Sequence, residues 1–195
     1  MKNRIITISR QFGSGGHTIG KQVAEKLGIP CYDHELVVKV AKEFGLSQDY
    51  VQENSEYAEH GNFLGNLLEE GRDFRGMSRQ DYLWNYQRQT ILKLAERESC
   101  VIVGRCADYI LRDTADCLRV FIHASMEKRA ERIVRVYGQR EDSPEKRLKD
   151  KDKRRRAYYQ YYTDMEWGNV ENYHIALDSG VLGLDKCAEI IAGLY

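Results

Sequence analysis

A glycine-rich segment near the N-terminus is the part of the sequence best suited to bind an anion. It reads Gln11-Phe-Gly-Ser-Gly-Gly-His17 and is followed by Thr18. Glycines let backbone amides turn toward an anion and approach it closely, and a helix that begins here adds the partial positive charge of its N-terminus. We therefore predict a phosphate-binding loop; the alternative is a merely tight turn. The candidate phosphate-binding residues are Arg10, Gly13, Ser14, Gly15, Gly16, His17 and Thr18.

The residues on either side place this loop between a strand and a helix. Residues 4–9 are mostly apolar and β-branched, which is typical of a short buried strand. After the glycines, apolar residues recur at helical spacing from Ile19 to Leu27, and Gly28 ends the helix. The order strand, glycine loop, helix is the context that a phosphate loop requires.

The loop can be aligned with the pattern G-x-x-x-x-G-K-[ST] in two registers. In the first register, Arg10 stands at the first glycine position and Gly15 at the second, while Gly16 replaces the lysine. His17 follows, and Thr18 is available as a ligand for magnesium. This register begins the loop where the strand ends.

The second register matches the pattern more literally. Gly15 and Gly20 are then the two glycines and Lys21 is the lysine, but Gln22 replaces the Ser or Thr. This loop would begin well beyond the end of the strand. Because the helical periodicity that starts at Ile19 places Lys21 on the helix, we favour the first register.

The favoured register lacks the lysine that would bridge the β- and γ-phosphates. Phosphate charge must then be met by arginines from elsewhere in the chain, or by Arg10, His17 or Lys21. Arginine suits this role because its planar guanidinium group binds two phosphate oxygens at once.

Two later segments are rich in arginine. Arg129 and Arg132 lie three residues apart on one face of a predicted helix at 126–136, directly after a predicted strand. Arg132 is thereby directed toward the carboxyl edge of the sheet; the alternative is a solvated helix face. Residues 140–156 carry both signs of charge, which by itself is typical of an exposed, salt-bridged helix. We expect the aromatic residues within 158–162 to pack this segment against the core rather than to stack on a base.

Strands and helices alternate along the whole chain, which predicts a parallel sheet covered on both faces. Ligands of such sheets bind beyond the carboxyl ends of the strands. Residues 46–80 are polar with weak periodicity and predict short helices or a mobile insertion. The predicted strands are 4–9, 29–33, 99–104, 118–123 and 174–178, and the further helices are 36–44, 81–97, 126–136 and 184–194.

Four segments together resemble the cytidylate kinase-like family, a group of P-loop proteins of the nucleoside monophosphate kinase type. They are Ile6–Gly16, Val101–Arg105, Val120–Arg132 and Asp152–Tyr159. The altered phosphate loop departs from well-established cytidylate kinases, which bears on catalytic competence and substrate more than on the fold.

The resemblance implies an α/β, three-layer P-loop kinase fold: a central five-stranded parallel sheet with helices on both faces and a helical lid. Residues 1–195 would form a single domain. A variable helical insertion at about 46–97 would lie on the acceptor side. A lid at about 138–163 would close over the phosphates and exclude water, which otherwise accepts the phosphoryl group.

The resemblance also assigns site residues. Arg132 would contact phosphate, and Arg154 and Arg155 of the lid would act on the transferring phosphoryl group as catalytic residues. Arg105 would hold the phosphate of the acceptor, or would be a surface arginine after a strand. Asp33 resembles an acidic position of the acceptor site, although a helix N-cap explains it nearly as well.

The activity implied is transfer of the γ-phosphoryl group of ATP to a nucleoside monophosphate, CMP or dCMP. Magnesium would bridge the donor phosphates, with Thr18 as its protein ligand. Positioning and charge neutralisation carry such reactions, so no general base is assigned. Two alternatives remain: a kinase for another small acceptor, and a nucleotide-binding regulatory protein without turnover.

The amino-acid composition indicates which partners the protein binds and in which compartment it works. Lys+Arg and Asp+Glu both number 30, so bulk charge gives no support to nucleic-acid binding, and small-molecule nucleotides are the expected partners. No apolar stretch is long enough for a membrane span. The five cysteines show no C-x-x-C pair, which favours reduced thiols and a cytoplasmic protein.

Overall fold

One parallel sheet organises the residues that this computed structural model describes, 4–33 and 79–195. Its strand order is β2-β3-β1-β4-β5, and every neighbouring pair is parallel. The predicted five-stranded parallel sheet is thus confirmed. The strands are β1 Arg4–Arg10, β2 Cys31–Tyr32, β3 Cys100–Val103, β4 Asp116–His123 and β5 Ile175–Asp178.

The described helices agree with most of the predicted ones. Helices of only three or four residues, α6, α9 and the 3-10 helix η1, were not predicted because one turn shows no helical periodicity. The predicted helix 36–44 lies outside the described residues, as does the expected insertion up to residue 78. The helices are α1 Gly16–Leu27, α5 Arg79–Arg97, α6 Ala107–Ile110, α7 Met126–Tyr137, α8 Pro144–Thr163, η1 Val170–Asn172, α9 Ser179–Leu182 and α10 Leu184–Gly193.

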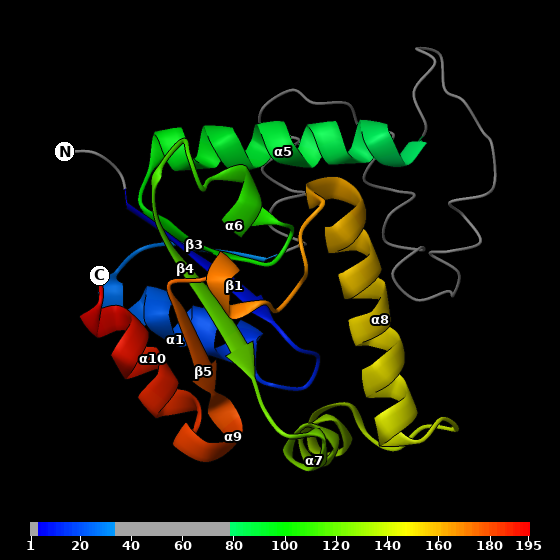
Figure 1. Cartoon of the computed structure of the whole chain (residues 1–195). Coiled ribbons are helices and arrows are strands. Elements are labelled where there is room, and N and C mark those ends of the chain that lie inside the picture. Colours follow the sequence, from blue (N-terminus) through cyan, green and yellow to red (C-terminus); the bar gives the residue numbers. More distant parts are fainter. Residues whose placement is uncertain (1–3, 34–78) are drawn as a thin grey trace.

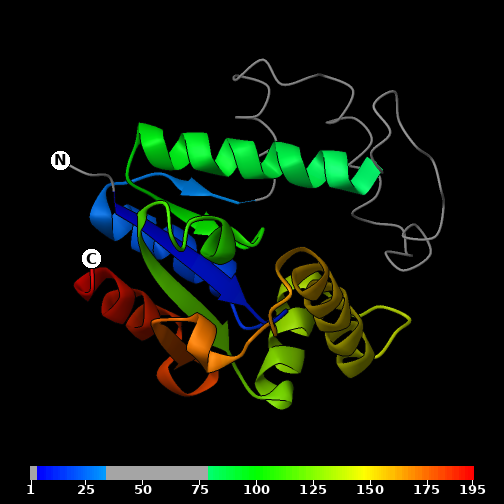
Figure 2. The ribbon, with the colours of Figure 1, turned by 45° about the horizontal axis from the view of Figure 1, so that its top comes forward.

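Helices cover both faces of the sheet and give three layers (Figures 1 and 2). On one face, Ile19 and Val23 of α1 pack with Ile191 of α10 against the strands. On the other face, Ile91 and Leu94 of α5 pack with the short helix α6. Because β1 is central, its isoleucine side chains are fully buried between the two helix layers.

Helices α7 and α8 form a separate pair beyond the carboxyl end of β4 (Figure 1). The hydroxyl of Ser125 caps α7 by accepting from the Lys128 amide at 3.2 Å. Ser143 caps α8 in the same way, and Pro144 occupies its first turn. The charged segment at residues 140–156 therefore forms most of a helix with a capped N-terminus.

One face of α8 is buried although most of the helix is charged. Leu148 is fully buried in a cluster with Ala130 and Ile133 of α7. Further along, the ring of Tyr162 stacks on Trp84 of α5, with centroids 4.5 Å apart and planes at 10°. The expected packing role of the 158–162 aromatic segment is confirmed.

Truncating Leu148 tests how strongly α8 is held on α7. We expect Leu148→Ala to lower the free energy of unfolding by about 2–5 kcal/mol, because it removes buried methyl groups and leaves a cavity. Urea denaturation measures this change. Lys149→Ala, at an exposed position of the same helix, is the control and should stay within about 0.5 kcal/mol of wild type. Equal effects of the two substitutions would contradict the packing described.

Candidate active site

The loop between β1 and α1 presents a set of unused backbone donors. The amides of Gly13, Gly15, Gly16, His17 and Thr18 make no hydrogen bond to an acceptor in the described part of the chain. Helix α1 begins at Gly16, so three of these amides are its orphan N-terminal donors. Such a cluster of N–H groups at a helix N-terminus favours an anion.

The glycines of the loop are required by conformation and by space. Gly13 and Gly15 have φ of 81° and 82°, in the left-handed region that favours glycine. A Cβ at Gly13 would lie 2.9 Å from both the carbonyl oxygen of Arg129 and Cγ2 of Ile133. A Cβ at Gly15 would lie 2.5 Å from Cδ2 of Leu184. The loop is therefore pressed against α7 and α10.

Ser14 fixes the loop from inside rather than facing a ligand. Its side chain is buried, with Oγ 2.9 Å from the Gln11 carbonyl oxygen and 3.2 Å from that of Ile122. Its own carbonyl oxygen accepts a 2.6 Å hydrogen bond from Ser179. Its amide donates to the Gln11 carbonyl oxygen at 3.3 Å. Both the side chain and the backbone of Ser14 are thus engaged within the protein.

The position of Lys21 distinguishes the two registers. Lys21 lies within α1, beyond its first turn, and is exposed. The loop itself ends at Gly15, the N-cap of that helix. The expectation that Lys21 belongs to the helix is confirmed, and this geometry favours the register in which Gly16 stands at the lysine position.

Arg132 reaches the loop from α7, as its spacing predicted. A Cβ at Gly15 would lie 3.3 Å from both Nε and Cζ of Arg132, so the guanidinium group covers this glycine. Its Nη2 donates a 3.0 Å hydrogen bond to Oγ1 of Thr18. Arg132 therefore places a positive charge over the N-terminal turn of α1.

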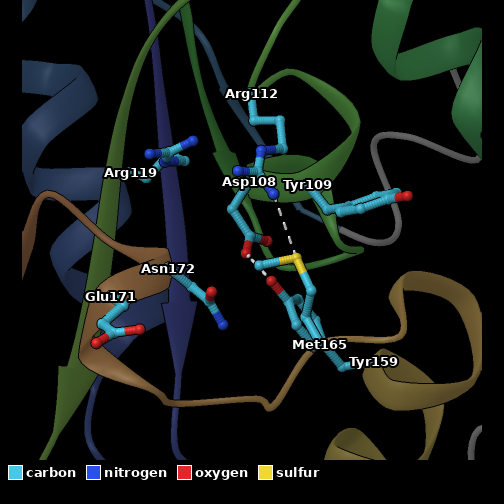
Figure 3. A pocket seen from close by; sticks show the side chains of 8 residues that line it. All are labelled: Asp108, Tyr109, Arg112, Arg119, Tyr159, Met165, Glu171 and Asn172. Atoms are coloured by element: carbon cyan, nitrogen blue, oxygen red, sulfur yellow. Dashed lines mark hydrogen bonds between the residues drawn. The ribbon is translucent and has the colours of Figure 1, made fainter.

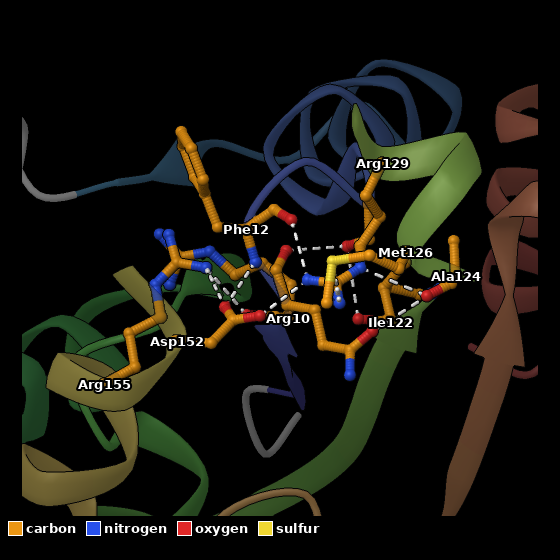
Figure 4. A network of polar contacts seen from close by, with 10 residues as sticks. Arg10, Phe12, Ile122, Ala124, Met126, Arg129, Asp152 and Arg155 are labelled. Carbon is orange, nitrogen blue, oxygen red and sulfur yellow. Dashed lines mark hydrogen bonds and ion pairs between the residues drawn. The ribbon is translucent and has the colours of Figure 1, made fainter. Parts of the chain in front are cut away.

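A buried ion pair joins α7, α8 and the loop (Figure 4). Nη1 of Arg129 lies 2.6 Å from Oδ2 of Asp152, and both side chains are nearly inaccessible. The other carboxylate oxygen of Asp152 accepts the Phe12 amide at 2.7 Å. Arg129 also donates to the Ala124 and Phe12 carbonyl oxygens, at 3.1 and 3.2 Å. A buried pair is favourable when its remaining donors and acceptors are satisfied in this way.

Neither partner of this pair was assigned to the site from the sequence. Asp152 stood within a charged run that is typical of a solvated face. The usable signal was its spacing: Leu148, Asp152 and Tyr159 share one face of a helix, and all three are buried.

The two predicted lid arginines lie on different sides of α8. Nη1 of Arg155 donates a 3.0 Å hydrogen bond to the carbonyl oxygen of Arg10, and its guanidinium lies over the Phe12 ring. Burial lowers the pKa of Arg155. Arg154 is exposed, about 200° around the helix from Asp152. The structure thus brings Arg155 to the loop and does not bring Arg154 there.

Positive charge gathers at the end of β1. Burial, followed by repulsion from Arg155 and Arg105, lowers the pKa of Arg10 to about 9. Asp33 and Tyr137 offset this only in part. Closely placed guanidinium groups repel one another, and a bound anion would relieve that repulsion.

Arg105 lies in an unusual turn after β3. Gly104, Arg105 and Cys106 have φ of 79°, 62° and 54°, so three successive residues are left-handed. For the two non-glycine residues this conformation carries strain, and such strain gathers at functional sites. Buried Gln87 of α5 supports the turn by donating a 3.1 Å hydrogen bond to the Arg105 carbonyl oxygen.

The side chains of Asp33, which follows β2, and His17, in the first turn of α1, contact each other. Nε2 of His17 lies 2.8 Å from Oδ2 of Asp33. The structure therefore joins a predicted phosphate-binding residue to a predicted acceptor-binding residue. The His17 side chain is engaged in this contact, while its amide makes no hydrogen bond in the described part of the chain.

A second polar network surrounds the buried carboxylate of Asp108 (Figure 3). Oη of Tyr159 donates a 2.7 Å hydrogen bond to Oδ2 of buried Asp108, and Ser9 donates to Oδ1 at 3.2 Å. Burial raises the pKa of Asp108, although these hydrogen bonds oppose the shift. The cavity beside it, of about 20 Å³, suits one water molecule and no nucleotide.

Within the described ranges, no three His, Cys, Asp or Glu side chains are placed to hold a metal ion. None of the helices described there could cross a bilayer, being too short or too polar.

The sheet order, the glycine loop after β1 and the arginines from α7 and α8 define a P-loop kinase type of α/β protein. Comparison with solved structures agrees. Shikimate kinase from Acinetobacter baumannii superposes with a TM-score of 0.55 at 16% identity, over 98% of this chain and 92% of that chain. An uncharacterised protein from Eubacterium ventriosum reaches a TM-score of 0.74 at 29% identity, over 98% of both chains.

The family model described as the cytidylate kinase-like family matches residues 5–181. The chain therefore belongs to the cytidylate kinase-like family, as the sequence motifs predicted. A similar protein is the cytidylate kinase of Archaeoglobus fulgidus, 30% identical over 190 residues, which are 95% of this chain and 91% of that protein.

The Arg129–Asp152 pair can be tested by a double-mutant cycle. We expect Arg129→Met and Asp152→Asn each to lower the free energy of unfolding by about 3–5 kcal/mol, since each leaves a buried group without its partner. The double variant should lose clearly less than the sum of the two. Arg135→Ala, at an exposed position of α7, is the control. Strict additivity in urea denaturation would show that the two side chains do not interact.

The pH dependence of stability tests the environment of Asp108. Because its pKa is raised in the folded state, the folded chain holds this proton more tightly than the unfolded chain. Its stabilising contribution is therefore full below the ordinary pKa of Asp, about 3.9, and is lost as pH rises through the folded pKa.

We expect the stability of wild type relative to Asp108→Asn to decrease over the range in which the pH rises above about 4, the ordinary pKa of Asp. Urea denaturation of both proteins across this range measures the difference. A difference that is constant with pH would contradict the raised pKa.

Proposed function

We propose that this protein transfers the γ-phosphoryl group of ATP to a nucleoside monophosphate, with CMP or dCMP as the acceptor. The observation that carries the proposal is the loop after β1, where five amides are unused and the guanidinium group of Arg132 covers Gly15. Family membership and the similarity to proteins named cytidylate kinase support the choice of acceptor.

The donor phosphates would bind at the glycine loop. The amides of residues 13 and 15–18 would donate hydrogen bonds to phosphate oxygens, and Arg132 would neutralise charge at the N-terminal turn of α1. Arg155, tied to the Arg10 carbonyl oxygen, would act on the transferring group from the lid. In-line transfer depends on such placement and charge neutralisation rather than on covalent catalysis.

The hydroxyl group of Thr18 is suited to magnesium. Oγ1 of Thr18 accepts a hydrogen bond from Arg132 and keeps a second lone pair. Mg²⁺ keeps several waters and binds few protein ligands where substrate phosphates are present, so this single oxygen fits it. When bound, Mg²⁺ would neutralise charge on the donor phosphates.

The acceptor would bind between the ends of β2 and β3. Arg105 would hold the acceptor's phosphate. It lies in the strained turn after β3, and its guanidinium adds positive charge near Arg10. The Asp33–His17 pair lies at the loop side of this space. Residues 138–163, which include α8, would serve as the lid, and the exposed Arg154 would join the site only on closure.

The proposal also concerns the cellular compartment in which the protein works. All five cysteines are free thiols, and burial raises the pKa of Cys100 to about 12, which keeps that thiol protonated and unreactive. These properties suit a protein of the reducing cytoplasm. The balance of 30 basic and 30 acidic residues suits small-molecule nucleotides rather than nucleic acid as partners.

A panel of nucleoside monophosphates tests the proposed function. Purified protein with ATP and Mg²⁺ should convert CMP or dCMP to the diphosphate with stoichiometric ADP, measured by chromatography. Binding of ATP without transfer to any acceptor would favour the regulatory alternative.

Arg105→Ala tests the acceptor site. We expect the KM for the acceptor to rise about tenfold or more with little change for ATP, since a charge-assisted hydrogen bond contributes about 1.5–3 kcal/mol. Arg135→Ala, at an exposed position of α7, is the matched control and should behave as wild type. An unchanged acceptor KM in Arg105→Ala would remove this residue from the site.

A further inference from the structure

The space above Gly16 is filled by the side chain of Arg10. A Cβ placed on Gly16 would lie 2.6 Å from Cβ and 2.8 Å from Cγ of Arg10. The backbone of Gly16 is ordinary right-handed helix, because it is absent from the residues of positive φ. Its conformation would admit any side chain, so it is Arg10 that requires glycine at this position.

The charged end of Arg10 lies beside β3. A Cβ placed on Gly104 would overlap Nη1 of Arg10, and would lie 3.0 Å from its Cζ. The side chain thus runs from the glycine loop, across Gly16, to the turn that carries Arg105. Under the proposed function, this path connects the donor phosphates to the acceptor phosphate.

The guanidinium group of Arg10 has no partner of its own. It makes no hydrogen bond or ion pair with any residue in the described part of the chain; only its carbonyl oxygen is used, by Arg155. The titratable groups that act on it are Arg155, Arg105, Asp33 and Tyr137; burial first, and then repulsion from Arg155 and Arg105, lowers its pKa to about 9. A cation held in this way is a binding group for an anion.

Other basic side chains fit the place of the loop lysine less well. Arg132 covers Gly15 and is bonded to Thr18. Lys21 is exposed on α1 beyond its first turn. Arg10 alone, of these three, occupies the volume directly over residue 16.

We propose that Arg10 and Gly16 have exchanged the residue types of a standard phosphate loop, and that the guanidinium group of Arg10 replaces the missing lysine. This inference rests on the proposed function. During transfer, an acceptor phosphate oxygen bonds to the γ-phosphorus as the bond to the β–γ bridging oxygen breaks, giving ADP. Arg10 neutralises charge on the oxygens of the moving group and takes no proton.

Reversing the exchange is the decisive test. Arg10→Gln, which keeps most of the stem without the charge, should lower kcat about 100-fold or more, the typical effect of removing a group that stabilises transition-state charge. Arg10→Gly should be similarly impaired. The double variant Arg10→Gly/Gly16→Lys restores the first glycine and the lysine of the standard pattern and should be at least tenfold more active than Arg10→Gly.

Two further variants complete the comparison. Gly16→Lys alone should be impaired, because its side chain collides with the stem of Arg10. Lys21→Ala should match wild type. Near-normal kcat in folded Arg10→Gln, loss of activity in Lys21→Ala, or a folded double variant no better than Arg10→Gly would each overturn the inference.

Binding of inorganic tripolyphosphate separates this inference from the proposed function. In calorimetry, wild type and the double variant should bind tripolyphosphate, and Arg10→Gln should bind it at least tenfold more weakly. If wild type transfers phosphate to no acceptor but its binding follows this order, the proposed function fails and the inference stands. If transfer occurs while tripolyphosphate affinity is the same in all variants, the inference fails and the function stands.

Discussion

The carboxylate of Asp152 is the contact on which the geometry of the site depends. It accepts the Phe12 amide of the loop at 2.7 Å and pairs with Arg129 of α7 at 2.6 Å, from a position on α8. Three segments distant in the sequence therefore meet at one buried group. A buried carboxylate demands such partners, because an unpaired charge away from water is strongly unfavourable. The position of α8, and with it Arg155, follows from this requirement.

Once these segments are held, positive charge is in excess at the end of β1. The unused amides belong to a loop in which Arg132 covers Gly15 and the stem of Arg10 covers Gly16. Arranging donors and cations in advance means that little reorganisation is needed when a phosphate binds. Under our proposal, a loop without its lysine can still hold a polyanion because the cation comes from β1 and α7 instead.

The sheet, the loop and the start of α1 could be predicted from local signals, since β-branched runs, glycines and capping residues act within a few positions. Asp152 could not be separated by charge from the solvated residues around it; only its spacing from Leu148 and Tyr159 marks the buried face of α8. The helix face of Arg132 predicted that it reaches the site. The sequence did not predict that Arg154 lies on the exposed side of α8, away from the loop.

Contacts between distant residues were the least predictable. The pairing of His17 with Asp33 depends on how β2 is placed beside the loop. The left-handed turn at Arg105 and Cys106 has no local signature, because neither residue favours that conformation. The filling of the space over Gly16 by the side chain of Arg10 is visible only in the three-dimensional structure.

An amide-resolved NMR titration with ATP tests the central claim most directly, that the loop after β1 embraces a polyanion. The account predicts that the largest and most salt-sensitive shifts fall on the amides of residues 13–18, with smaller ones at the arginine-bearing faces of α7 and α8. Saturable binding of ATP that leaves these amides unchanged and perturbs a different part of the molecule would contradict it.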